Sequence, residues 1–238
     1  MVLQRNHLQC YVAVVETLAL GEQVTLTDAV ARPQRVDLVG QYVRLEPLEA
    51  DGDAAELFAA SHGDPKTEKL WTYMGNGPFS SLEAMTSFLE VRATSDDPLF
   101  FTVYEAASGR RVGMTSFMNI VSEMRRLELG NIWYAPPVQR TKVNTETIYL
   151  MLRRTFDDLG YRRAEWKCDA LNARSRAAAL RLGFSFEGLF RQHMIVKGRN
   201  RDTAYFSMLD KEWPQKRANL EAWLYSDEKR SLRNMNTV

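Results

Sequence analysis

The stretch from Leu127 to Gly188 decides the fold: LELGNIWYAPPVQRTKVNTETIYLMLRRTFDDLGYRRAEWKCDALNARSRAAALRLGFSFEG. Its hydrophobic pattern predicts a strand, an irregular turn, an amphipathic helix, a second strand, a helix that begins at an asparagine, and a third strand. A strand that leads through a polar loop into a helix N-terminus forms an anion site, because free backbone N–H groups and the helix dipole point at one spot. The stretch therefore predicts a site for an anionic ligand.

The first helix of this stretch is predicted from Thr145 to Gly160. Its inward side chains recur at the spacing of one helix face, and Gly160 suits a left-handed C-terminal cap. The side chains of that face are Ile148, Met151, Leu152, Thr155, Phe156 and Leu159. A strand–helix–strand unit makes parallel neighbours, so strands 127–134 and 163–170 are expected to lie side by side and parallel.

Alternating and helical patterns predict further elements on both sides of this stretch. Short turns join three consecutive strands, which implies an antiparallel meander. In chain order the expected elements are a strand 43–48, a helix from Asp51 or Asp53 to Ser61, a helix from Ser80 or Ser81 that ends before Asp97-Pro98, strands 99–104, 111–120 and 127–134, a strand from Phe184, a strand 203–209 and a helix 213–224.

Bulk composition restricts the class of protein. The chain has 238 residues, of which 45% are hydrophobic and 26% charged, as in a soluble globular protein. A net charge of +1 excludes a global field that would recruit nucleic acid or an anionic membrane. Cys10, Cys168 and the three histidines have no metal-ligand spacing, and we expect a cytoplasmic protein without a membrane span.

Four pieces of the chain resemble the GCN5-related N-acetyltransferases (GNAT), and within them the ribosomal-protein alanine N-acetyltransferase branch. The strand ELGNIW at 128–133 is similar to that branch's E-L/I-G-Y-W-L strand, and QRTKVNTE at 139–146 is similar to its Q-G-x-G-x-A-T-E loop. NARS at 172–175 resembles its N-x-x-S, and LGFSFEG at 182–188 resembles its L-G-F-x-x-E-G. The pieces keep their order and spacing across residues 38 to 212.

The resemblance implies an α/β (α+β) GNAT fold, with a mixed, mostly antiparallel sheet of about seven strands and helices on both faces. We expect residues 39–212 to form the acetyltransferase domain, 1–38 an extension of unknown role, and 213–238 a C-terminal helix and tail. The implied co-substrate is acetyl-CoA, without a metal. The expected cofactor contacts are Trp133, Tyr134, Gln139, Arg140, Lys142, Asn144, Thr145, Asn172 and Arg176.

The loop before the first helix departs from the family pattern. We expect its two glycines to fall where Lys142 and Asn144 stand, although glycine lets a backbone approach pyrophosphate closely. Lys142 can supply a cation to a phosphate instead, and Asn144 can cap the helix. The alternative is an ordinary capped loop without a ligand.

The implied chemistry requires a base, because an amine that attacks a thioester must lose a proton. Glu128 is the candidate: it shares the parity of Gly130 and Ile132 and has apolar neighbours. A surface or salt-bridged strand carboxylate is an alternative of at least equal weight for Glu128, and Asp169 is the second candidate base. The family places the backbone donors for the developing oxyanion at residues 132–135.

The second helix of the stretch supplies two more candidates. Asn172 is expected to cap this helix, and the family implies that its amide also contacts the pantetheine arm or the acceptor side. Ser175 lies one helical turn further on and is the candidate to contact the cofactor or to protonate the departing thiolate. Arg174 or Arg176 is expected to hold the 3′-phosphate of coenzyme A.

We therefore expect an acetyl-CoA-dependent N-acetyltransferase that modifies a primary amine, either a protein N-terminus or a small amine. The expected partners are acetyl-CoA and the amine acceptor, with neither nucleic acid nor membrane, and a homodimer is left open. A non-catalytic acyl-CoA-binding or interaction module on the same fold is the competing hypothesis.

Overall fold

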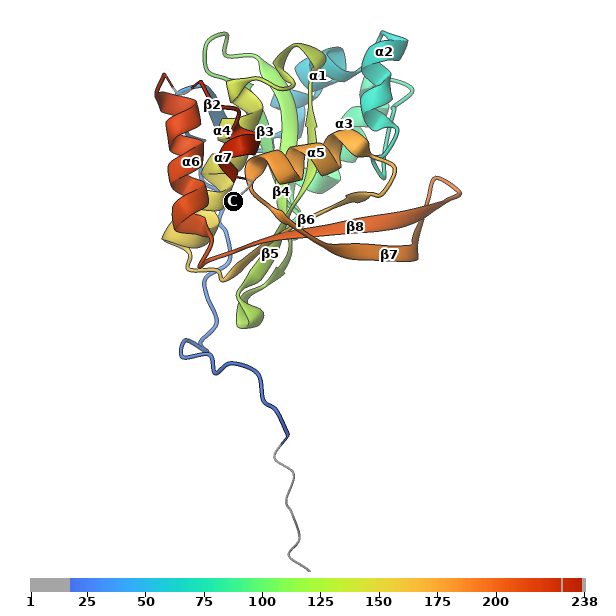
Figure 1. The fold of residues 1–238 in the computed structure, drawn as a ribbon. Coiled ribbons are helices and arrows are strands. Elements are labelled where there is room, and N and C mark those ends of the chain that lie inside the picture. Colours follow the sequence, from blue (N-terminus) through green and yellow to red (C-terminus); the bar gives the residue numbers. More distant parts are fainter. Residues whose placement is uncertain (1–17, 228, 237–238) are drawn as a thin grey trace, which may run out of the picture.

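The computed structural model describes residues 18–227 and 229–236, which form one β-sheet with helices on both faces (Figure 1). The strands in chain order are β1 (Leu38–Val39), β2 (Val43–Pro47), β3 (Leu99–Glu105), β4 (Arg111–Val121), β5 (Arg126–Tyr134), β6 (Arg163–Asp169), β7 (Ser185–Val196) and β8 (Arg199–Leu209). The helices are α1 (Ala50–Ser61), α2 (Pro65–Glu68), α3 (Leu82–Ala93), α4 (Lys142–Arg153), α5 (Ala173–Leu182), α6 (Trp213–Tyr225) and α7 (Leu232–Asn236).

The sheet has the strand order β1-β2-β3-β4-β5-β6-β8-β7. Every neighbouring pair is antiparallel except β5 and β6, which α4 connects as a parallel crossover. Their ladder is short: it pairs Arg126 with Arg163 at one end and Glu128 with Glu165 at the other. Beyond Glu128, the described residues give β5 a strand partner on its β4 side alone, so one edge of its backbone is left for another ligand.

Two hydrophobic cores cover the two faces of the sheet. The core that we call the α4 core lies on the side of α4, α5 and α6, and the α1–α3 core lies on the opposite side. Members of the α4 core include Leu127, Leu129, Ile148, Leu152 and Phe206. Members of the α1–α3 core include Leu57, Trp71, Leu89, Met114 and Trp133. The expected mixed sheet with helices on both faces is confirmed, with eight strands in the described part of the chain.

A β-bulge in β5 corrects one expectation. Trp133 pairs with Met114 and Gly130 pairs with Ser116, so two residues of β5 face one residue of β4, and Asn131 adopts φ = 53°. The extra residue reverses the side-chain alternation. Ile132 therefore packs against the α4 core, and the prediction that it shares a face with Glu128 and Gly130 is wrong.

The start of α4 also differs from the prediction. The helix begins at Lys142, not Thr145, and its N-cap is Thr141, whose hydroxyl accepts the Val143 N–H at 3.3 Å. Asn144 is thus the third residue of the helix and does not cap it. At the other end α4 continues into a π-helical turn, Arg154–Asp158, before Gly160 with φ = 70°.

The chain segments at both ends of the domain pack on it. Arg32 donates to the Ile120 carbonyl oxygen at 3.2 Å and Arg35 donates to that of Ser95 at 2.7 Å, so part of the expected extension lies along β4 and the end of α3. Residues 1–17 of that extension lie outside the described part. In α4, the buried carboxylate of Glu146 accepts the Val43 N–H and the Tyr225 hydroxyl, which joins α4 to both β2 and α6.

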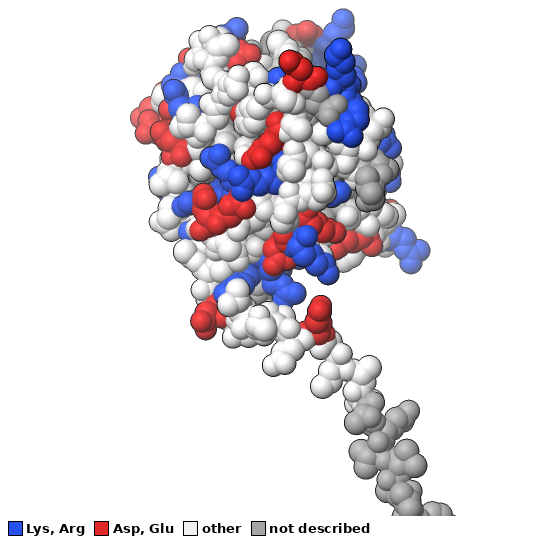
Figure 2. Space-filling model, turned by 60° about the vertical axis from the view of Figure 1, so that its left-hand side comes forward, with Lys and Arg blue, Asp and Glu red and all other residues white. Residues whose placement is uncertain are grey.

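The surface carries no broad patch of one charge on the face drawn in Figure 2, where Lys and Arg alternate with Asp and Glu. This distribution agrees with the net charge of +1. Among the helices of the described residues, none has the length and apolar character needed to cross a membrane.

Candidate active site

The β5–α4 loop and the N-terminus of α5 follow the two strands β5 and β6, and most of the expected site residues lie on these two segments. Gln139 donates its side-chain N–H to the Tyr134 carbonyl oxygen at 2.8 Å and so folds the β5–α4 loop back on the strand. Arg140 follows with φ = 65°, in the left-handed region. The loop therefore makes a sharp turn immediately before the first N–H groups of α4.

The conformation of this turn corrects the alignment of the two family glycines with residues of this loop. Counted from Gln139, the loop Q-G-x-G-x-A has its glycines at Arg140 and Lys142, not at Lys142 and Asn144. The positive φ of Arg140 is a conformation that glycine adopts freely. The backbone thus keeps the path of a glycine loop, although an arginine stands there.

Lys142 does not direct its charge to this turn. Its Nζ donates to the Leu224 carbonyl oxygen at 2.6 Å and to the Tyr42 hydroxyl at 3.0 Å, and both acceptors lie away from the loop on α6 and the β1–β2 side. The structure therefore does not support the expectation that Lys142 supplies a cation to a phosphate.

Arg181 is a site residue that the sequence patterns did not identify. From the end of α5 its guanidinium donates to Asn144 Oδ1 and Thr145 Oγ1, both at 3.0 Å, across the first turns of α4. Within the described part of the chain no carboxylate pairs with it. Burial lowers the pKa of Arg181, and the neighbouring charge of Arg140 lowers it further. Two cations thus lie close together at the start of α4, and no carboxylate of residues 18–227 or 229–236 forms an ion pair with either of them.

Tyr134 adds a polar group to this cluster. Its hydroxyl is buried and has no hydrogen-bond partner of good geometry among the described residues. Burial raises its pKa well above the ordinary value, and the nearby Thr147 hydroxyl and the charge of Arg181 act in the opposite direction. Arg140, Arg181, Tyr134 and the α4 N-terminus together form what we call the α4 anion cluster. Such a set fits a phosphate, because it offers charge and hydrogen-bond donors in one place.

The N-terminus of α5 has the predicted cap. Asn172 Oδ1 accepts the Ser175 N–H at 3.0 Å, and its amide nitrogen has no partner in the described structure. Ser175 Oγ accepts the Trp166 indole N–H at 3.0 Å and lies near Cys168, whose pKa is raised by burial. Arg176 is exposed and donates to the Ala170 carbonyl oxygen at 3.3 Å, so it lies at the rim.

Glu128 is buried and ion-paired. Its Oε2 accepts from Asn119 Nδ2 at 2.6 Å and lies 2.9 Å from Lys167 Nζ. No described residue donates to Oε1, which lies 3.8 Å from the position that a Cβ on Gly130 would take. Asp169, the second candidate base, instead accepts the Leu171 N–H at 2.9 Å and stabilises the turn before α5.

Trp133 completes the set of predicted residues. Its side chain is buried in the α1–α3 core, with its ring centroid 5.4 Å from that of Trp71. Only the backbone of Trp133 and its neighbours is therefore placed at the unpaired edge of β5. Lys197, near the tip of the β7–β8 hairpin, donates to the Trp71 carbonyl oxygen at 2.8 Å and links the hairpin to the α1–α3 side.

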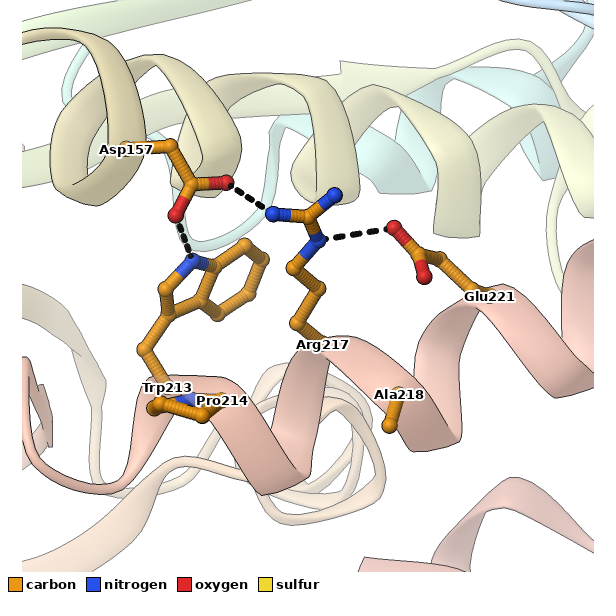
Figure 3. A pocket seen from close by; sticks show the side chains of 6 residues that line it. All are labelled: Asp157, Trp213, Pro214, Arg217, Ala218 and Glu221. Atoms are coloured by element: carbon orange, nitrogen blue, oxygen red, sulfur yellow. Dashed lines mark hydrogen bonds and ion pairs between the residues drawn. The ribbon is translucent and has the colours of Figure 1, made fainter.

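A separate pocket of about 320 Å³ lies between the end of α4 and α6 (Figure 3). Its charged groups satisfy one another. Asp157 accepts the Trp213 indole N–H at 2.7 Å and pairs with Arg217 at 3.0 Å, and Arg217 also pairs with Glu221 at 2.8 Å (Figure 3). This pocket therefore lacks the free charge of the α4 anion cluster. Within the described ranges, no three His, Cys, Asp or Glu side chains gather as a metal site.

The family model of the acetyltransferase (GNAT) domain matches residues 43–185, and the chain therefore belongs to the GNAT acetyltransferase family. Among solved structures it is similar to a GCN5-related N-acetyltransferase from Brucella melitensis, with 41% identity, a TM-score of 0.84, and coverage of 88% of this chain and 98% of that one. The family expected from the four sequence pieces is confirmed.

Two other relatives extend the comparison. YdaF of Bacillus subtilis (strain 168), which its name assigns provisionally to the ribosomal N-acetyltransferases, is 30% identical over 105 residues, or 44% of this chain. The chain spans 57% of the length of YdaF. The microcin C7 self-immunity acetyltransferase MccE, solved in complex with acetyl-CoA and AMP, shares the fold at 21% identity and a TM-score of 0.63, with coverage of 71% of this chain and 93% of MccE.

Proposed function

We propose that this chain transfers the acetyl group of acetyl-CoA to a primary amine by direct attack of the amine on the thioester. The observation that carries the proposal is the unpaired edge of β5 beyond Glu128, which lies between two helix N-termini. Membership of the GNAT family supports the reaction class, and the acetyl-CoA bound to the MccE fold supports the co-substrate.

The α4 anion cluster is the proposed site of the coenzyme A phosphates. Backbone N–H groups at the start of α4 would donate to the pyrophosphate, with charge from Arg140 and Arg181. Gln139, Asn144 and Thr145 hold this cluster in shape through their bonds within it. We assign Lys142 a structural role, since its ammonium group is bound to Leu224 and Tyr42.

The amide nitrogen of Asn172 and the unpaired backbone of Trp133 and Tyr134 are proposed to bind the pantetheine arm. Backbone N–H groups at residues 132–134 would stabilise the developing oxyanion, since the Ala135 N–H already donates to the Val112 carbonyl oxygen at 2.7 Å. In the reaction the amine nitrogen forms a bond to the carbonyl carbon while its proton passes to Glu128. The carbon–sulfur bond breaks, and the thiolate receives a proton from the Ser175 hydroxyl, which is regenerated from solvent.

The acceptor is proposed to be a protein N-terminus or a small amine. Similarity to YdaF favours a ribosomal protein, and the balanced surface charge favours neither a strongly basic nor a strongly acidic acceptor. A non-catalytic acyl-CoA-binding module is the competing function. It is favoured by the ion pair that engages Glu128 and by the loss of both loop glycines.

Two measurements test the proposal. Acetyl-CoA at about 100 times its Kd should raise the free energy of unfolding by about 2.7 kcal/mol, seen as a thermal shift. A panel of peptides with free Ala or Ser N-termini and of small amines should then release coenzyme A thiol. No thermal shift contradicts both functions, and a shift without thiol release from any amine favours the binding module.

The role of Glu128 is tested separately. Glu128→Gln should slow turnover by about 10²-fold or more, because a positioned base contributes that much, while the Kd for acetyl-CoA stays unchanged. Glu90→Gln, on the exposed face of α3, is the matched control. An unchanged rate for Glu128→Gln removes it as the base.

A further inference from the structure

Five charged side chains of alternating sign cross the sheet from β5 to β7 on its α1–α3 side. Lys167 lies 2.9 Å from Glu128 and 2.9 Å from Glu165, and Arg163 lies 2.9 Å from Glu165. Arg163 also binds Glu187 through two nitrogens, at 2.8 and 2.5 Å. The order along the network is therefore Glu128, Lys167, Glu165, Arg163 and Glu187.

Lys167 is the member of this network that touches the proposed base. Burial lowers the pKa of its ammonium group, but the charge of Glu128 and the bonds to both carboxylates outweigh that effect and leave the pKa raised. The Tyr205 ring, with its centroid 4.9 Å from Nζ, covers another side of the ammonium ion. Lys167 is therefore a charged group held in one place.

The bonds to Glu128 are asymmetric. Asn119 and Lys167 both bind Oε2, at 2.6 and 2.9 Å. Oε1 is left beside Gly130, toward the end of β5 that has no β6 partner. Two donors on one oxygen fix the rotation of the carboxylate and present the other oxygen to the proposed reaction site.

We propose that Lys167 is a positioning residue for Glu128: with Asn119 it holds Oε2 and fixes the carboxylate so that Oε1 is directed at the proton of the amine. This inference rests on the proposed function of Glu128 as the base. A buried carboxylate without a cation tends to stay protonated, and a protonated carboxyl group cannot accept the proton.

The charged groups around Glu128 and Lys167 predict the direction in which the pH profile of activity moves when Lys167 is replaced. Glu165 and Arg163 from β6, Arg126 from β5, Glu187 from β7 and Tyr205 from β8 face Lys167 or its partners. From β4 the group that faces Glu128 is the neutral amide of Asn119. Glu165 keeps Arg163 and Arg126 when the Lys167 charge is removed. Among the described residues, Glu128 then has no cation in contact with it.

The decisive variant is Lys167→Met. The acidic limb of the kcat/KM profile against pH should move upward by at least one pH unit, while the Kd for acetyl-CoA stays within twofold. Lys167→Arg, which keeps the charge, should return the acidic limb most of the way to its wild-type position. Arg126→Met is the control. It also removes a cation from this network, but Arg126 pairs with Glu165, at 3.8 Å, and not with Glu128, so we expect no shift of the acidic limb.

Asn119→Gly provides a second variant in case Lys167→Met does not fold. Glycine suits the φ of 49° at this position, and the change removes the other donor to Oε2. We expect a smaller upward move of the same limb. Profiles for both variants that superimpose on the wild-type profile overturn the proposal. If Glu128→Gln slows the reaction but the acidic limb moves in neither Lys167→Met nor Asn119→Gly, the positioning role fails while Glu128 remains the proposed base. If Glu128→Gln has no effect, the proposed base itself is wrong.

Discussion

The N-termini of α4 and α5 follow the two strands of the one parallel pair, yet they are built differently. Both have a short polar cap, Thr141 in α4 and Asn172 in α5. The α5 turn keeps its family motif, and Asn172 and Ser175 bond locally as the motif predicts. The α4 turn has lost its glycines, and a cation from the far end of α5, Arg181, lies over it instead.

The difference shows for which residues a sequence motif can predict the side-chain contacts. Asn172 has a short side chain whose partner is three residues away, so its sequence position determines its contact. Lys142 and Arg181 have long side chains whose partners lie 82 and 36 residues away, respectively. Their direction depends on which distant group the fold brings near. Four variants test this comparison.

Arg181→Met should have the largest effect. Loss of a charged donor to phosphate is expected to weaken acetyl-CoA binding by about 1.5 to 3 kcal/mol, or roughly 10- to 100-fold in Kd. Isothermal titration calorimetry measures the change, with the exposed Arg174→Met as the control. An unchanged Kd would remove Arg181 from the cofactor site and leave its charge unexplained.

Asn172→Ala should act on both folding and binding. The lost cap lowers the free energy of unfolding by about 1 kcal/mol, and the lost amide donor raises the Kd by roughly fivefold. Asn172→Ser separates the effects, since serine also caps helices. It should restore stability in urea titrations but not affinity. If serine restores both, the amide nitrogen does not bind the cofactor.

Lys142→Met should change stability but not affinity. The Leu224 carbonyl oxygen and the Tyr42 hydroxyl lose a charged donor, which costs about 1 kcal/mol of unfolding free energy. The Kd for acetyl-CoA should stay within twofold. A large loss of affinity would mean that Lys142 turns toward the phosphates when the cofactor binds.

Arg140→Gly should have the smallest effect. Relief of the left-handed conformation stabilises the turn by about 1 kcal/mol, and the added chain entropy of glycine offsets most of it. Stability measured in urea should therefore change little, and the Kd should rise about threefold through the lost charge. Tighter binding would show that the glycine of the family pattern favours acetyl-CoA binding more than the arginine does at this position.

The sequence predicted most of the fold correctly, because periodicity and turn residues are local properties. The meander 99–134, the parallel pair and the helices 82–93 and 213–225 follow from such patterns. The short strand β1 and the bulge at Asn131 do not, because a bulge is set by the pairing of two strands and leaves little trace in either. For the same reason Ile132 was assigned to the wrong face.

The candidate site likewise has a part that local sequence motifs predict and a part that depends on distant segments of the chain. Sequence motifs predicted the strand that becomes β5, the capped helix α5 and the carboxylate Glu128, since each belongs to a local pattern of a few residues. Only the tertiary structure shows that Lys142 turns to α6, that Arg181 reaches α4, and that Lys167 and Asn119 hold Glu128. Long charged side chains have many rotamers, and the partner that selects one of them comes from another part of the chain.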